Sequence, residues 1–94
     1  MRLKKIDAQL GRMFKEQREK AGLSQQKVCQ LLGYSTPQFL SNFERGICNM
    51  PLPKLKELLE IYGMDPEQVV SFILELQHKY LRAELLEKKS KLKA

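Results

Sequence analysis

Apolar residues recur every three or four positions along most of the chain, and polar residues fill the positions between them. This is the period of a helix that is buried on one side, and no segment alternates strictly as a half-buried strand does. Glycines at positions 22, 33, 46 and 63 each follow a helical segment, where a left-handed residue commonly ends a helix. The pattern therefore predicts an all-α fold, a compact bundle of five helices.

The beginnings of these helices are marked by residues that cap a helix or fit its first turn. The expected helices run from Asp7 as N-cap to about Ala21, from Ser24 as N-cap to Leu32, from Thr36 as N-cap to Arg45, from Pro53 to about Tyr62, and from Asp65 as N-cap to about Leu92. In the second and third helices, the positions expected to face the core are Val28, Leu31, Leu32, Leu40, Phe43 and Ile47. Gly11, inside the first helix, indicates close packing.

The second and third helices are short and only three or four residues apart, which is a helix-turn-helix pattern. The outward side of the third carries Gln38, Asn42 and Arg45, joined by Ser41, where a solvated helix normally carries Glu and Lys. An amide can donate and accept hydrogen bonds together, as the major-groove edge of adenine requires. This side is predicted to read bases, and the alternative is a merely polar surface.

Composition places the chain among soluble globular domains, and its charge is unevenly distributed. The 94 residues suffice for one domain and carry a net charge of +6. Residues 1–5 hold +3 and residues 79–94 hold +4, so the remainder is almost neutral. Basic ends suit a polyanion such as nucleic acid, although a solubilising tail explains the charge equally well. The expected organisation is a basic arm (1–6), a DNA-binding domain (7–77) and a basic helical extension (78–94).

Several classes of function are disfavoured. No apolar run approaches the ~20 residues of a membrane span, so no membrane partner is expected. Two cysteines without a leader segment indicate a reducing, cytoplasmic location. The single histidine, His78, has no partner at metal-ligand spacing, so neither a metal nor another cofactor is expected. An enzyme is disfavoured because no nucleophile–base pair, paired acid site or phosphate loop is visible.

Two linked motifs carry a resemblance to a known family. The run GLSQQKVCQLLGYS at 22–35, followed by LSNFERG at 40–46, resembles the helix-turn-helix of the phage Cro and repressor (XRE-type) family. The resemblance covers about residues 9–75 and implies a lambda repressor-like bundle that binds operator DNA, usually as a dimer. The spacing from Gly33 to Gly46 is one residue longer than the commonest spacing in that family, so the turn is expected to be longer.

The resemblance also suggests roles for individual residues. Base contacts are expected from Gln38, Asn42, Thr36 and Ser41. Contacts to the DNA backbone are expected from Gln25, Ser24, Arg45, Lys27 and Phe39, the last of which fits partial burial at least as well. Arg18 and Glu44 match a pair that bridges the first and third helices in the family, and two unrelated surface charges are the alternative. Cys29 stands where the family prefers alanine and is expected to pack in the core.

The last helix is longer than one small domain needs. Leucines continue along it beyond the core, and a partner helix is the expected cover for them. Dimerisation is assigned to Tyr80, Leu81, Leu85 and Leu92. The sequence thus predicts a cytoplasmic, homodimeric regulator of transcription, in the simplest case a repressor, that binds double-stranded operator DNA. The alternatives are a solvated basic tail after Tyr80, and an antitoxin or adaptor whose C-terminal helix binds a second protein.

Overall fold

The computed structural model of the chain describes residues 4–87. Within them it contains five α-helices, a final π-helical turn and no strand, which confirms the all-α prediction. The elements are α1 (Lys4–Lys20), α2 (Gln25–Leu32), α3 (Gln38–Glu44), α4 (Leu52–Tyr62), α5 (Pro66–Arg82) and the π-helical turn η1 (Ala83–Glu87).

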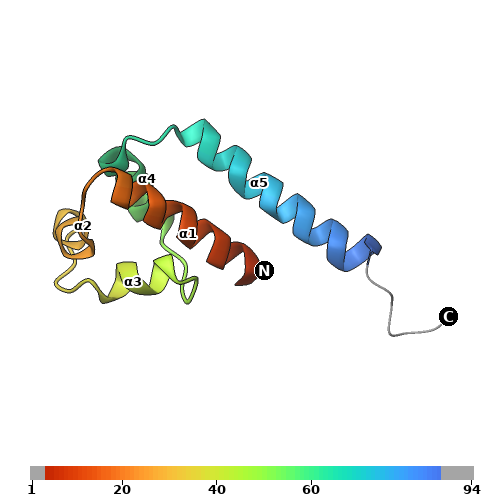
Figure 1. Ribbon diagram of the computed structural model, residues 1–94, viewed down its shortest axis with the longest axis horizontal. Helices are drawn as coiled ribbons and strands as arrows, with labels where there is room; N and C mark the ends of the chain where they lie inside the picture. Colours follow the sequence, from red (N-terminus) through yellow and green to blue (C-terminus); the bar gives the residue numbers. More distant parts are fainter. Residues whose placement is uncertain (1–3, 88–94) are drawn as a thin grey trace.

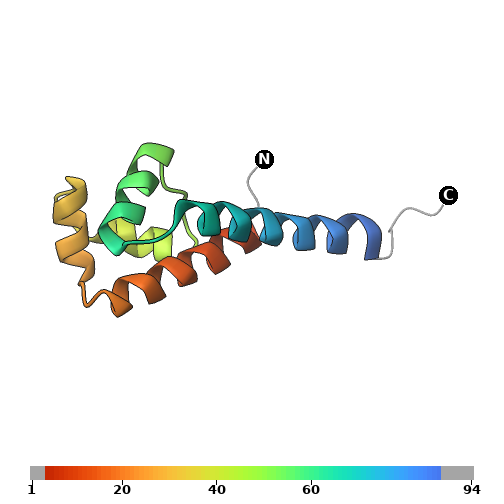
Figure 2. The ribbon, with the colours of Figure 1, turned by 90° about the horizontal axis from the view of Figure 1, so that it is seen from above.

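The first four helices gather at one end of the molecule, and the long α5 extends away from them (Figures 1 and 2). In both views α5 runs beside α1 in the opposite direction and continues past the beginning of α1. Helix α3 lies along the other side of α1 (Figure 1). Helix α1 is therefore the support against which both α3 and α5 are placed.

The core draws at least one buried side chain from each of the five helices. Its members are Phe14, Val28, Cys29, Leu32, Leu40, Phe43, Met50, Leu58 and Val69. The ring of Phe14 meets the ring of Phe43 edge to face, with 5.4 Å between their centroids. Each fully buried side chain of this size contributes about 1.5–3 kcal/mol, and this packing fixes α3 on α1.

Two predicted helix starts are present as expected. The Ser24 hydroxyl accepts a hydrogen bond from the Lys27 N–H at 3.1 Å, so Ser24 caps α2. The Asp65 carboxylate accepts the Glu67 N–H at 3.0 Å and caps α5. Helix α2 is followed by its C-cap Gly33, whose φ of +87° is the left-handed conformation predicted for it.

Other predicted boundaries are wrong. Helix α1 begins at Lys4, so Asp7 lies in its first turn and does not cap it. Ile6 is buried, and its packing draws residues assigned to the basic arm into the helix. The N-cap of α3 is Pro37 and not Thr36, because the longer turn delays the helix by one residue. Helix α4 begins at Leu52, one residue before Pro53.

The predicted end of the last helix is only partly within the described residues. Regular α-helix ends at Arg82 and is followed by η1 through Glu87, whereas the sequence predicts one helix to about Leu92. A π-helical turn holds more residues per turn than an α-helix, so it changes the helical register at Leu85. Leu92 lies outside the described residues.

Two residues that were expected in the core are exposed. Leu31 is 52 % exposed, because α2 packs through Val28 and Leu32 and Leu31 lies beside that contact. Ile47 is 54 % exposed, because it follows Gly46, whose φ of +76° turns the chain away from the buried side of α3. By contrast, the predicted core residues Leu40 and Phe43 are buried.

Helices α1 and α3 approach closely at two glycines. A Cβ atom on Gly11 would lie 2.4 Å from the carbonyl oxygen of Phe43, which confirms close packing at this position. A Cβ atom on Gly46 would lie 2.6 Å from the Cα of Ala8. The C-terminal end of α3 therefore rests directly on the backbone of α1, and a larger side chain at either glycine would displace it.

Candidate nucleic-acid interface

The outward side of α3 carries a row of hydrogen-bonded polar side chains. Gln38 Nε2 donates to Asn42 Oδ1 at 3.0 Å, and Arg45 Nη2 donates to the same oxygen at 2.8 Å. Gln38 and Arg45 are exposed and Asn42 is partly buried. Residues three and four apart share a helix face, so α3 and its C-cap Arg45 place these three side chains in line. We call Gln38, Asn42 and Arg45 the polar row.

The hydrogen bonds within the polar row distinguish its two amides. The Asn42 oxygen already accepts two hydrogen bonds, from Gln38 and from Arg45. In these bonds Gln38 uses one amide hydrogen, while its carbonyl oxygen and its second amide hydrogen take no part. Gln38 therefore offers a donor and an acceptor together, the pair that an adenine edge needs, and Asn42 holds Gln38 in place.

The other predicted base-contact residues lie beside the polar row. Thr36 is exposed in the turn before α3, next to the N-cap Pro37. Ser41 is partly buried, and its main-chain carbonyl accepts a long 3.4 Å hydrogen bond from Arg45 Nε. This contact orients Arg45 along the helix, at the end of the polar row opposite Gln38.

The residues predicted to contact the DNA backbone occupy different surroundings. Ser24 and Lys27 are exposed at the beginning of α2, where the first N–H groups of a helix lack intrahelical acceptors. Gln25 is partly buried, and its Nε2 donates to Glu44 Oε1 at 2.8 Å. Phe39 is partly buried and stacks on the ring of Tyr34 at 4.9 Å between centroids. The side chains of Gln25 and Phe39 are thus engaged within the protein.

A buried ion pair fixes α3 on α1. Arg18 Nε and Nη2 donate to the two carboxylate oxygens of Glu44 at 2.7 and 3.2 Å, and the side chains are only 10 % and 2 % exposed. Arg18 Nη1 also donates to the Leu23 carbonyl at 2.8 Å. The hydrogen bond to Glu44 raises the pKa of Arg18, whereas burial opposes this. With Gln25 on the same carboxylate, this cluster joins α1, α2 and α3.

Lys54 on α4 contacts the helix-turn-helix, and this contact was not predicted from the sequence. Its ammonium donates to the Leu32 carbonyl at 2.6 Å, at the C-terminal end of α2. It also lies 3.2 Å from a carboxylate oxygen of Glu57 and 5.5 Å from the centroid of the Tyr34 ring. A contact to a main-chain carbonyl 22 residues away leaves no pattern in the sequence. The only sequence signal at Lys54 was the spacing of polar and apolar residues along α4, which does not indicate this contact.

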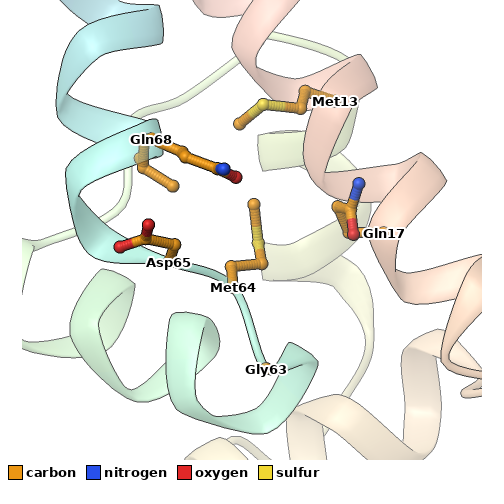
Figure 3. A pocket seen from close by; sticks show the side chains of 7 residues that line it. Met13, Gln17, Gly63, Met64, Asp65 and Gln68 are labelled. Carbon is orange, nitrogen blue, oxygen red and sulfur yellow. The ribbon is translucent and has the colours of Figure 1, made fainter.

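One hollow of the surface lies away from the polar row. A cavity of about 260 Å³ opens between α1 and the turn from α4 to α5 (Figure 3). Its lining residues are Met13, Gln17, Gly63, Met64, Asp65, Gln68 and Val69. None of them belongs to α2 or α3.

Among the described residues, potential metal ligands do not cluster, and one of the two free cysteines is buried in the core. Among residues 4–87, no group of three potential ligands from His, Cys, Asp and Glu comes together. Burial raises the pKa of Cys29, which is 1 % exposed within the core and fits the packing role expected for it. Within the same part of the chain, no helix is long and apolar enough to cross a membrane.

The residues assigned to dimerisation do not all lie on one surface. Leu81 and Leu85 are 41 % and 74 % exposed on the outer side of α5 and η1. Tyr80 is partly buried and borders a shallow hollow with Ile6 of α1, so it belongs to the side of α5 that faces α1. Val70 and Leu74, earlier on α5, are 52 % and 58 % exposed as well.

Comparison with known proteins agrees with this geometry. Searches among curated proteins and among solved structures give no significant match. The sequence does match a family described as a helix-turn-helix domain over residues 9–72, which is more than half of the chain. The matched region contains α2, the turn, α3 and α4 in full, most of α1 and the first part of α5. The chain therefore belongs to the helix-turn-helix domain family.

Proposed function

We propose that this protein is a sequence-specific double-stranded DNA-binding regulator of transcription that acts as a repressor by occupying its operator. The polar row carries the proposal. Three side chains with amide and guanidinium groups lie exposed or partly buried along one short helix and are held in order by hydrogen bonds. Seven residues span about 10 Å, which suits insertion into a major groove about 12 Å wide.

In the proposed complex, α3 enters the major groove with its polar row against the base edges. Gln38 reads adenine through its free carbonyl and amide hydrogen, and Asn42 positions it. Thr36 and Ser41 flank these contacts, and Arg45 reaches a base edge or phosphate at the far end. The N-terminal amides of α2, with Ser24 and Lys27, hold a phosphate through the positive end of the helix dipole. Gln25 acts there through its backbone, since its side chain is bonded to Glu44.

The experiment is selection of bound sequences from random duplex DNA, followed by affinity measurements on variants. We expect Gln38→Ala to lose about 1–3 kcal/mol of preference for the selected sequence, the range for one bidentate base contact. Asn42→Ala should lose less, because its role is to position Gln38. Both should keep nearly unchanged affinity for random DNA.

Gln30→Ala is the matched control, since Gln30 is an exposed glutamine on α2 outside the polar row. It should retain the preference of the unmodified protein. If Gln38→Ala and Asn42→Ala also retain that preference, the assignment of base reading to the polar row is wrong.

We further propose that the protein acts as a homodimer. Val70, Leu74 and Leu81 are exposed and lie four and seven residues apart, so they share one side of α5, and Leu85 of η1 is exposed beyond them; we call these four side chains the apolar stripe. Several large apolar side chains exposed on one side of a helix are typical of an interaction surface. A two-fold pair of recognition helices can also meet half-sites about 34 Å apart, which one short helix cannot do. Tyr80, which borders α1, is not part of this proposed interface.

A second candidate function uses the same stripe. An antitoxin or adaptor would cover it with a different protein rather than with another copy of itself. The apolar stripe supports this candidate, and the polar row does not require it. Recovery of a second chain bound to α5, together with loss of that chain on changing Leu81, would favour the adaptor.

A further inference from the structure

We propose that Lys54, on α4, is a positioning residue that sets the orientation of the recognition helix α3 through the turn that precedes it. This inference rests on the proposed DNA-binding function and assigns to it a residue outside the helix-turn-helix itself. The residues involved are Lys54, Tyr34 and Phe39, and Lys54 also contacts the main-chain carbonyl of Leu32.

The first contact fixes the end of α2. The last carbonyl groups of a helix lack intrahelical donors and carry the negative end of its dipole. The Lys54 ammonium donates to the Leu32 carbonyl at 2.6 Å, so it supplies both a hydrogen bond and a compensating charge. Glu57, 3.2 Å away on the next turn of α4, holds the ammonium in place. The C-terminal end of α2 is thereby attached to α4.

The second contact extends this attachment into the turn. Tyr34 directly follows the C-cap Gly33, and its ring centroid is 5.5 Å from the Lys54 ammonium, within the range of a cation–π interaction. The Tyr34 N–H donates to the Cys29 carbonyl at 2.8 Å, which anchors the backbone of this residue to α2. Tyr34 is thus held by both α2 and α4.

The third contact reaches the recognition helix. The rings of Tyr34 and Phe39 stack with 4.9 Å between centroids and 26° between planes. Phe39 is the residue after Gln38, which begins α3 and carries the base-reading amide. No side chain caps the beginning of α3 with a hydrogen bond, and the stacked rings attach this end of the helix to the turn by packing. Lys54 acts on Gln38 through this sequence of contacts and does not itself contact a base.

The test compares Lys54→Met with Lys56→Met. Lys56 is exposed, lies two residues away on α4 and carries the same charge, so both variants lose the same net charge. We expect Lys54→Met to lower the preference for the selected operator over random duplex by about fivefold, part of the discrimination of one base contact. Lys56→Met should leave this preference unchanged. Lys54→Arg should restore it, because guanidinium also donates to a carbonyl and interacts with an aromatic ring.

Two further measurements separate positioning from other roles. Hydrogen exchange at the Tyr34 amide should become faster in Lys54→Met than in Lys56→Met, whereas exchange at Phe14 in the core should not differ. The log–log slope of operator affinity against salt concentration should be the same in Lys54→Met as in the unmodified protein. A phosphate contact by Lys54 would lower the log–log slope by about 0.9 and overturn the positioning role.

Equal operator preference in Lys54→Met and Lys56→Met would also overturn the positioning role of Lys54. If the unmodified protein prefers no duplex sequence, the proposed function itself fails, and the positioning role fails with it. The two failures are distinguishable, because the first leaves the preference of the unmodified protein intact.

Discussion

Tyr62, the last residue of α4, carries a buried polar atom that has no hydrogen-bond partner among the described residues. Its hydroxyl is buried and neither donates nor accepts a hydrogen bond among the described residues, although the centroid of its ring lies 6.4 Å from that of Phe14. Burial, and to a smaller extent the charge of Glu44, raises the pKa of Tyr62 well above its ordinary value. The neutral phenol is therefore strongly preferred in the folded protein. Packing of the aromatic ring stabilises the fold, whereas the unpaired hydroxyl does not.

We predict that Tyr62→Phe leaves the protein at least as stable at neutral pH and changes its response to alkali. A group whose pKa is raised by folding stabilises fully below its unfolded pKa, about 10 for tyrosine, and loses that contribution as pH rises further. The unmodified protein should therefore lose stability above about pH 10 more steeply than Tyr62→Phe. Urea unfolding of both proteins at pH 7 and at several values above 10 measures this, and parallel curves would contradict it.

The residues of the proposed site could be identified from sequence only where their partners were close in sequence. Gln38, Asn42 and Arg45 are one and two turns apart on one helix, so helical spacing was enough to place them together. The proximity of Arg18 and Glu44 came from the family resemblance and not from spacing. Lys54 bonds to a main-chain carbonyl, which every residue has, so no residue type marked the contact.

At the scale of the elements, the approach of α3 to α1 depends on Gly11. We predict that Gly11→Ala destabilises the protein by about 1–3 kcal/mol, although alanine is the better helix former by about 1 kcal/mol. The added Cβ would lie 2.4 Å from the Phe43 carbonyl oxygen and 2.6 Å from that of Glu44, so α3 must move. Chemical denaturation measures the change.

Lys15→Ala, at an exposed position one turn further along α1, is the control and should stay within about 0.5 kcal/mol. A Gly11→Ala protein as stable as the unmodified one would show that α3 can withdraw from α1 without cost.

Helix centres were better predicted than helix ends for a physical reason. Core positions such as Phe14 and Leu58 follow from the 3.6-residue period, which is a property of the whole element. The first residue of α1 depends instead on tertiary packing of Ile6, and that of α3 depends on how a longer turn closes. Asp7 and Thr36 are good capping residues, but packing in the folded chain determined both boundaries.

At the scale of the whole molecule, the apolar stripe has a spacing that suits pairing with a second copy. An antiparallel pair of α5 helices that crosses between residues 77 and 78 places Val70 opposite Leu85 of the second copy. The same crossing places Leu74 opposite Leu81. Because both pairs share one crossing point, a single two-fold axis satisfies all four positions at once, as an isologous interface requires.

We therefore predict that the protein is a dimer at about micromolar concentration and that the double variant Leu74→Glu with Leu81→Glu is a monomer. Each glutamate would be desolvated against an apolar partner in the paired state, whereas both positions are exposed in the single copy, so folding should be retained. Leu52→Glu is the control, because Leu52 is an exposed leucine at the beginning of α4, outside the stripe, and this variant should remain dimeric. Sedimentation equilibrium distinguishes the states, and circular dichroism verifies the fold of each variant.

A dimeric double variant would place the interface elsewhere, and a monomeric unmodified protein would leave the stripe to a different partner. If the prediction holds, the monomeric variant should also bind a two-half-site operator with the lower affinity of a single recognition helix, which connects the stripe on α5 to the function of α3.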